Sequence, residues 1–162
     1  MRHGTALDVG QQGVQRDAER PLSLEGRQKA KDVARGLKVL KVQPTCIATS
    51  NLIRARQTAE IVGSVLGKAI PIEGCRFLEP GAVAADLLDW LRTRQDLSVL
   101  VVGHLPDLAE IASELLCGHT RADMQFKKAA VCCLVFDKTP SAGTARLEWL
   151  LQPRHLLAAA NE

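Results

Sequence analysis

The segment SVLVVGHLP, residues 98–106, gives the clearest indication of the fold. Residues 98–103 form a continuous, largely β-branched apolar run that ends in glycine, which predicts a strand buried on both faces. Such strands occur in parallel sheets that helices cover on both sides. Pro106 fits the first turn of a following helix, whose inward-facing residues would be Leu108, Ile111, Ala112, Leu115 and Leu116.

Helices and strands alternate on both sides of this segment. Upstream, the sequence predicts a helix capped by Ser23, a strand at 46–49, a helix that ends at Gly67, a weak strand at 69–72 and a helix over 83–91. Downstream, residues 131–136 and 147–151 predict a hairpin that turns at 140–143. We therefore expect an α/β fold: a three-layer α/β/α sandwich with a mostly parallel central sheet, a C-terminal antiparallel hairpin and no large cap insertion.

Length and composition describe one globular domain over residues 1–162. The hydrophobic fraction of 46% and the charged fraction of 24% exclude intrinsic disorder as the main description. A net charge of +3, from 21 basic and 18 acidic residues, is too small and too evenly spread for a nucleic-acid binder. No apolar run approaches the length of a membrane span, so we expect no membrane partner.

The cysteines and the N-terminus favour a cytoplasmic protein. The five cysteines are an odd number without a C-x-x-C motif, which favours reduced core thiols over disulfides or metal ligands. The first residues, Met1-Arg2-His3-Gly4, show no apolar region of a signal peptide. Residues 5–20 are rich in Gly, Gln and Asp and predict a long loop, which in a compact domain is either functional or mobile.

Three short segments carry residues suited to chemistry: Arg2-His3-Gly4, residues 50–58 and residues 102–106. Two of them directly follow predicted strands, and ligands bind at the carboxyl ends of strands in sheets of this kind. If the first segment ends a strand as well, Arg2, His3, Arg54 and His104 converge on one rim.

Such a set would suit phosphoryl transfer without a metal or other cofactor. Guanidinium groups bind phosphate oxygens through paired hydrogen bonds, and a helix N-terminus beside Arg54 adds N–H donors. The nearby positive charges would lower the pKa of His3 and keep it a neutral nucleophile, with a backbone carbonyl fixing its tautomer. A protonated His104 could stabilise charge in the transition state.

Each residue also has a plain structural interpretation. Arg54 and Arg56 could lie on a solvated helix face, and their i, i+2 spacing allows at most one to point into a site. His104 could be a buried structural histidine. His119 and His155 lie in polar connecting stretches without a partner motif, so we assign them no role.

The chain resembles the histidine phosphatase superfamily, also called the phosphoglycerate mutase-like fold, and within it the SixA-type phosphohistidine phosphatases. The resemblance rests on Arg20-Pro21-Leu22-Ser23 with Gly26 and on the segments 54–58, 78–81 and 103–106. It implies that His3 is the nucleophile and that Arg2, Arg54 and His104 form the phosphate pocket. Arg20 would lie near the pocket or anchor the loop, and Glu79 would be a general acid or an exposed loop carboxylate.

This chain differs from the superfamily pattern at its N-terminus. Members of the superfamily carry a hydrophobic strand before Arg-His-Gly, whereas only Met1 precedes Arg2 here. We therefore expect the first strand to be almost absent, the Met1 amino group to lie close to the pocket, and stability and activity to be reduced.

The substrate implied is a phosphohistidine protein, such as a phosphorelay domain. The labile P–N bond needs little general-acid help, and a site without a cap suits a phosphorylated side chain. A small-molecule phosphomonoesterase and a non-catalytic phospho-binding module remain the alternatives.

Overall fold

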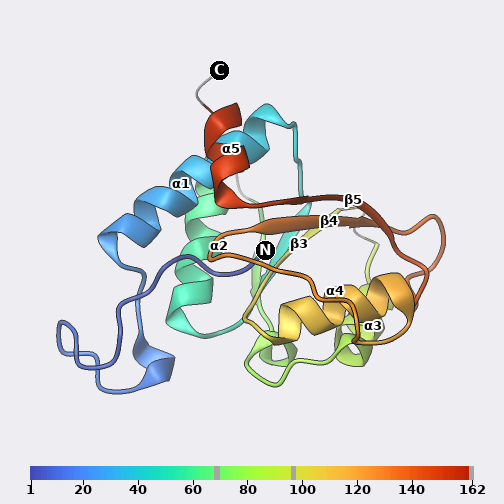
Figure 1. Ribbon diagram of the computed structural model, residues 1–162, viewed down its shortest axis with the longest axis horizontal. Helices are drawn as coiled ribbons and strands as arrows, with labels where there is room; N and C mark the ends of the chain where they lie inside the picture. The colour runs from blue at the N-terminus through green and yellow to red at the C-terminus, as the bar shows by residue number, and fades with distance from the viewer. Residues whose placement is uncertain (68–69, 96–97, 161–162) are drawn as a thin grey trace.

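The computed structural model describes residues 1–67, 70–95 and 98–160, and its helices lie on two sides of a layer of strands (Figure 1). Three parallel strands are hydrogen-bonded in the order β2-β1-β3: β1 (Cys46–Thr49), β2 (Ile72–Gly74) and β3 (Val99–Val102). An antiparallel hairpin follows, with β4 (Val131–Val135) and β5 (Arg146–Leu151). The helices are α1 (Leu24–Val39), α2 (Ile53–Leu66), α3 (Ala84–Arg92), α4 (Asp107–Cys117) and α5 (Pro153–Ala159), with 3-10 turns η1 (Asp17–Glu19) and η2 (Arg76–Leu78).

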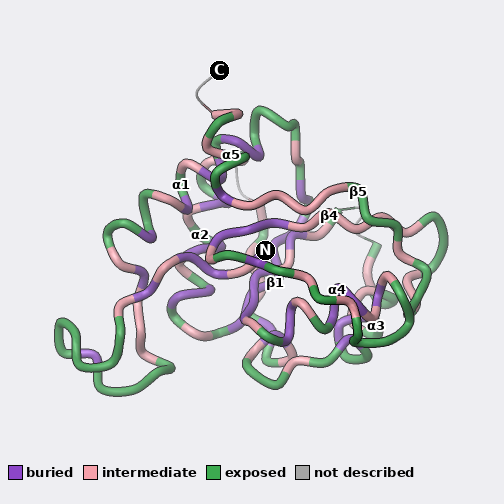
Figure 2. Tube along the Cα trace, viewed as in Figure 1, coloured by how far each residue is buried: buried purple, intermediate pink, exposed green. Residues whose placement is uncertain are grey.

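Side chains of alternate residues in the parallel strands enter two separate cores. Ile47, Leu100 and Val102 pack with α1, α2 and α5 on one side of the sheet. Ala48, Val99 and Val101 pack with α3 and α4 on the other side. This period of two is the geometry of a strand covered on both faces, and it gives the three-layer arrangement that the sequence predicted. The burial is greatest in β1, whose four residues are all buried, whereas β5 at the edge is half-buried to exposed (Figure 2).

Met1 to His3 occupy the position of a strand between β3 and β4. On one side, His3 N–H donates to the Gly103 carbonyl at 3.1 Å and Gly103 N–H donates to Met1 at 3.2 Å. On the other side, Arg2 N–H donates to Ala130 at 3.0 Å and Ala129 N–H donates to His3 at 3.1 Å. As expected, the first strand is almost absent: among the described residues no strand precedes β1, and Arg2 forms only an isolated bridge with Gly103. The backbone hydrogen bonds of Met1 to His3 nevertheless connect the parallel sheet to the residues before the hairpin.

The Met1 amino group donates to the Val101 carbonyl at 2.7 Å and is buried. The amino group therefore contacts the backbone of β3, next to the hydrogen bonds between Met1, His3 and Gly103. Burial lowers its pKa to about 6, and the nearby Cys132 thiol offsets this only in part.

Most predicted elements lie within one or two residues of their expected positions, and the differences are local. The N-cap of α2 is Leu52, which has no capping side-chain hydrogen bond, and the preceding Ser50 hydroxyl lies 2.8 Å from His104 Nε2. The predicted strand at 69–72 shifts, since β2 begins at Ile72, and Ala69 lies outside the described residues. The prediction that His155 lies in a connecting stretch is wrong, because residues 153–159 form α5, which packs against α1.

Between Gly67 and β3, the described residues form only β2, η2 and α3, so no large cap covers the carboxyl ends of the strands there. In the parts of the chain that the structure describes, no helix combines the length and apolar character that crossing a membrane requires.

The contact between α1 and α5 gives a prediction on stability. A methyl group added at Gly36 would lie 2.1 Å from the Leu156 carbonyl oxygen, so Gly36→Ala forces the two helices apart. We expect a loss of about 1–3 kcal/mol in the free energy of unfolding, measured by urea denaturation, as for other overpacked sites. Gly67→Ala is the control, because the same methyl group meets no atom within 4 Å there and the backbone is extended. Equal stability of the two variants would contradict this account.

Candidate active site

The ends of β1 and β3 and the neighbouring N-terminal segment bring the predicted residues together. Arg2 and His3 belong to the short N-terminal segment, Arg54 lies in the first turn of α2 after β1, and His104 directly follows β3. His3, Arg54 and His104 are buried, with 7%, 5% and 3% of their surface exposed. The rings of His3 and His104 lie 5.1 Å apart at an angle of 51°. Two imidazoles and two guanidinium groups thus share one rim of the sheet.

The His3 ring is fixed by the backbone that follows it. Its Nδ1 lies 2.7 Å from the Gly4 carbonyl oxygen, which can only accept, so Nδ1 carries the proton and Nε2 keeps its lone pair. Gly4 N–H donates to the Thr58 hydroxyl at 3.0 Å, and that hydroxyl donates to the Arg54 carbonyl at 2.7 Å. The nucleophile predicted from sequence is therefore tied to α2 through one threonine.

Burial and charge both keep His3 neutral. Burial, together with the charges of His104, Arg54 and Arg2, lowers its pKa to about 3, against the opposing effect of the hydrogen bond to Gly4. At neutral pH the ring is therefore unprotonated and Nε2 is available as a nucleophile.

His104 is also neutral, which differs from the protonated form that we considered for it. Burial and the Arg54 charge lower its pKa to about 4, although Asp107, Asp17 and Glu79 oppose this. Its Nε2 lies 2.8 Å from the Ser50 hydroxyl, which in turn accepts Leu52 N–H at 3.2 Å. If the Ser50 hydroxyl donates to Nε2, the His104 proton is on Nδ1.

The arginine side chains are held by groups outside the motif. Arg54 donates through Nη1 to the Asp17 carbonyl at 2.8 Å and through Nη2 to the Asp17 carboxylate at 3.0 Å. Arg2 donates through Nη1 to the Phe126 carbonyl at 2.8 Å. Each guanidinium is thereby fixed at its outer end, while its Nε stays unused.

Three buried side-chain nitrogens have no hydrogen-bond partner among the described residues: Arg2 Nε, Arg54 Nε and His104 Nδ1. All three belong to residues that the sequence predicted as a phosphate pocket. A buried donor without an acceptor costs about 1–3 kcal/mol, so such groups are rare and need an explanation. A tetrahedral oxyanion offers several acceptor oxygens to donors arranged in this way.

Two other predicted residues border this cluster. Arg20 donates to the Leu7 carbonyl, to Asp8 Oδ1 at 2.7 Å and to Asp17 Oδ1 at 3.0 Å, so it anchors the loop that holds Arg54. Glu79 Oε1 accepts a hydrogen bond from Asn51 Nδ2 at 2.8 Å, and the negative charge of Glu79 acts to raise the pKa of His104.

The structure separates Arg56 from the site, as the i, i+2 spacing predicted. Arg56 is exposed and pairs with Glu60 at 3.2 Å, whereas Arg54 is buried. Among the described residues, no group of three or more His, Cys, Asp or Glu side chains is arranged to hold a metal ion.

Sequence reasoning missed Asp17, Ser50 and Asp107 as supports of the site. Asp107 accepts Gly81 N–H at 2.9 Å and so holds the turn that follows Glu79. Ser50 ends a buried strand, which was a usable signal, whereas nothing in the sequence pattern of residues 5–20 singled out Asp17.

Comparison with known proteins identifies similar chains. A profile of the histidine phosphatase superfamily (branch 1) matches residues 1–80. Phosphohistidine phosphatase SixA of Escherichia coli is 32% identical over 164 residues, covering 98% of this chain and 95% of SixA. An uncharacterized protein of Picosynechococcus is 34% identical, covering 91% and 86%.

Solved structures agree with these sequence matches. The protein histidine phosphatase SixA complexed with tungstate superposes with a TM-score of 0.82 at 30% identity, covering 96% of both chains. A phosphoserine phosphatase of Entamoeba histolytica, with a TM-score of 0.66 at 18% identity and 96% coverage of both chains, shares the fold alone.

The lowered pKa values of His3 and His104 predict that acid destabilises the protein. Unfolded imidazoles bind protons below about pH 6.5, whereas the folded protein keeps these two neutral down to about pH 4 and 3. Stability present above pH 6.5 is therefore lost as the pH falls, by about 1.4 kcal/mol per pH unit for each group. We expect urea denaturation to show a smaller loss between pH 6.5 and 4.5 for His3→Gln/His104→Gln than for the parent.

The exposed His119 supplies the control for this measurement. His119→Gln should keep the pH dependence of the parent chain. The account is wrong if the double variant keeps it as well.

Proposed function

This chain belongs to the histidine phosphatase superfamily and is a phosphatase, and we propose that it hydrolyses phosphohistidine on a protein through a covalent phospho-His3 intermediate. One observation carries the proposal: the three buried side-chain nitrogens without a hydrogen-bond partner among the described residues belong to Arg2, Arg54 and His104, the residues around the neutral His3 ring. The similarity to SixA, a phosphohistidine phosphatase, supports the choice of substrate.

In the proposed pocket, Arg2, Arg54 and His104 bind the oxygens of the phosphoryl group. Arg2 and Arg54 supply positive charge together with their Nε donors, and His104 supplies its Nδ1 proton. Asp17 and the Phe126 carbonyl hold the outer nitrogens of the two guanidinium groups, so these donors are already oriented before substrate arrives. Arg20 contributes by holding Asp17.

Neutral His3 is the proposed nucleophile. Its Nε2 lone pair attacks phosphorus while the P–N bond of the substrate breaks, and the departing imidazole takes a proton from solvent water. The pair of electrons on Nε2 becomes the new N–P bond, so His3 acquires positive charge while Nδ1 keeps its proton and donates it in a hydrogen bond to the Gly4 carbonyl. Water then attacks phospho-His3, which releases inorganic phosphate and restores the neutral ring.

Glu79 is the proposed general acid for poorer leaving groups. It lies at the rim, held by Asn51, where its charge reaches His104. An imidazole leaving group is less basic than an alkoxide, so phosphohistidine depends on such an acid less than a sugar phosphate does.

The absence of a large insertion between β2 and α3 in the described chain supports a protein substrate, because an open rim admits a phosphorylated side chain on another domain. We place this activity in a single domain of residues 1–162 in the cytoplasm, without nucleic-acid or membrane partners. A small-molecule phosphomonoesterase of the same fold stays the second candidate, which the substrate comparison below tests.

Replacing the proposed nucleophile tests the covalent mechanism. His3→Ala should reduce turnover of a phosphohistidine protein by about a thousandfold or more, because the first step has no other nucleophile. Quenching the parent and ³²P-labelled substrate in alkaline denaturant should trap an acid-labile, base-stable phosphoprotein that His3→Ala lacks. His119→Ala, exposed and remote from the motifs, should behave as the parent.

Retained turnover by His3→Ala would remove the covalent mechanism. A higher kcat/KM for sugar phosphates than for the phosphohistidine protein, measured in one assay series, would favour the small-molecule alternative.

Removal of the Glu79 carboxylate should separate the two substrate classes. We expect Glu79→Gln to leave phosphohistidine turnover within about threefold while sugar phosphate turnover, where measurable, falls about a hundredfold. Glu60→Gln, which changes an exposed carboxylate of α2, is the matched control. A hundredfold loss on phosphohistidine would show that this leaving group needs the acid after all.

A further inference from the structure

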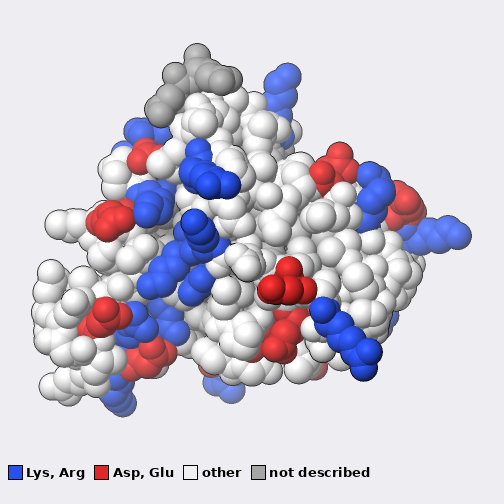
Figure 3. All heavy atoms as spheres, viewed as in Figure 1, with Lys and Arg blue, Asp and Glu red and all other residues white. Residues whose placement is uncertain are grey.

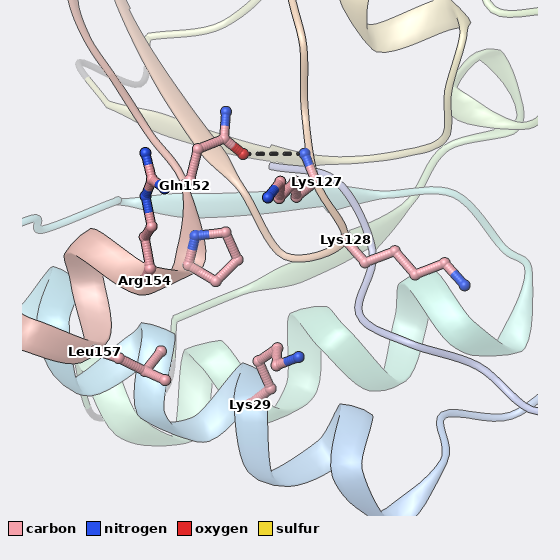
Figure 4. Close-up of a pocket in the computed structure, with 7 residues that line it drawn as sticks. Lys29, Lys127, Lys128, Gln152, Arg154 and Leu157 are labelled. Carbon is pink, nitrogen blue, oxygen red and sulfur yellow. Dashed lines mark hydrogen bonds between the residues drawn. The ribbon is translucent and has the colours of Figure 1, made fainter.

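A basic hollow lies between α1, α5 and the segment before β4 (Figure 4). It is lined by Lys29, Lys127, Lys128, Gln152, Pro153, Arg154 and Leu157. Four of these seven residues are cationic and none is acidic. We call Lys29, Lys127, Lys128 and Arg154 the basic patch.

The patch combines three separate parts of the chain. Lys29 comes from α1, Lys127 and Lys128 from the turn before β4, and Arg154 from the start of α5. Lys127 N–H donates to Gln152 Oε1 at 3.1 Å, and Gln152 Nε2 donates to the Gln125 carbonyl at 2.7 Å. These hydrogen bonds connect the turn to Gln152, the residue that precedes α5, and so hold the backbone that carries the two lysines.

The charges of the patch are poorly neutralised. Lys29 pairs with the exposed Glu25 at 3.0 Å, whereas no ion pair of Lys127, Lys128 or Arg154 occurs within the described ranges. Figure 3 shows basic side chains gathered where α1, α5 and the segment before β4 meet. On a chain with a net charge of only +3, this is a local concentration that favours an acidic surface.

The patch also borders the site directly. The Phe126 carbonyl binds Arg2, and the backbone of Ala129 and Ala130 pairs with His3 and Arg2, so Lys127 and Lys128 lie between two contacts of the site. On the α1 side, Gly26, one turn before Lys29, packs so closely on Thr5 that an added methyl group would lie 1.9 Å from the Thr5 carbonyl oxygen. The patch is therefore carried by segments whose neighbouring backbone contacts the site.

We propose that the basic patch docks an acidic surface next to the phosphohistidine of a protein substrate. The inference rests on the proposed function and adds a specificity determinant outside the reacting groups. A free phosphorylated amino acid carries no acidic protein surface for the patch to contact. The patch should therefore act only on protein substrates, and salt should weaken its effect.

The test compares two substrates with one double variant, Lys127→Glu/Lys128→Glu. The protein substrate is an acidic histidine phosphotransfer domain phosphorylated with phosphoramidate, and the small substrate is free phosphohistidine. At low salt we expect kcat/KM for the protein to fall about tenfold or more, and the difference from the parent to shrink at 0.5 M NaCl. Turnover of free phosphohistidine should stay within twofold.

Lys38→Glu/Lys138→Glu is the matched control, since it makes the same change in net charge at exposed lysines outside the patch. It should leave both substrates within twofold of the parent. The milder Lys127→Gln/Lys128→Gln, with a thermal melt of each variant, separates lost docking from lost folding.

The outcomes distinguish the two levels of the proposal. A parent that hydrolyses neither substrate overturns the proposed function, and the docking inference falls with it. A parent that hydrolyses both, with patch and control variants equally active on the protein, overturns the docking inference alone. An equal loss on free phosphohistidine also overturns it, because the lysines would then act on the reacting groups.

Discussion

The insertion of Met1 to His3 between β3 and β4 is the contact on which the rest of the site depends. Four backbone hydrogen bonds fix three residues on both sides, to Gly103 and to Ala129 and Ala130. They place the His3 ring at the rim where His104 also emerges, at a ring separation of 5.1 Å. They also join the parallel sheet to the hairpin, so the same hydrogen bonds serve the fold and the nucleophile.

Burial of ionisable side chains at this position lowers the stability of the folded protein, and the surrounding contacts limit that loss. Two imidazoles and the Arg54 guanidinium are buried, and each charged form loses hydration there. The imidazoles avoid the cost by staying neutral. Arg54 cannot, and it is instead bound by Asp17, whose pKa is lowered by its hydrogen bond to Arg20 and by the charge of Arg54. The loop of residues 5–20 therefore supplies the counter-charge of the pocket, which gives a physical reason for its length.

The sequence predicted the parts of this arrangement that depend on local pattern. The buried run before Gly103, the apolar stripes of the helices and the hairpin turn each decide their element within a few residues, and strand ends decide which side chains share a rim. It did not predict that Asp17 binds Arg54 or that Ser50 contacts His104, because these contacts join residues 37 and 54 positions apart through tertiary folding. It missed α5 because seven residues give little periodicity, and that helix is stabilised by packing on α1.

The distribution of charge across the site follows from the same physics. A hydrogen bond to an anion is strongest where water is excluded, so the donors that contact the phosphoryl group are buried and held by Asp17, Phe126 and Ser50. Attraction of a large partner requires the opposite environment, because charges that act over several ångströms in water must be exposed and free of nearby counter-ions. Lys127 and Lys128 supply such charges on the surface. The backbone one or two residues away from them, at Phe126, Ala129 and Ala130, contacts the buried site. The short turn before β4 thus separates a buried pocket suited to catalysis from a solvent-exposed surface suited to recognition. Residues of the surface can therefore be substituted without changing those of the pocket.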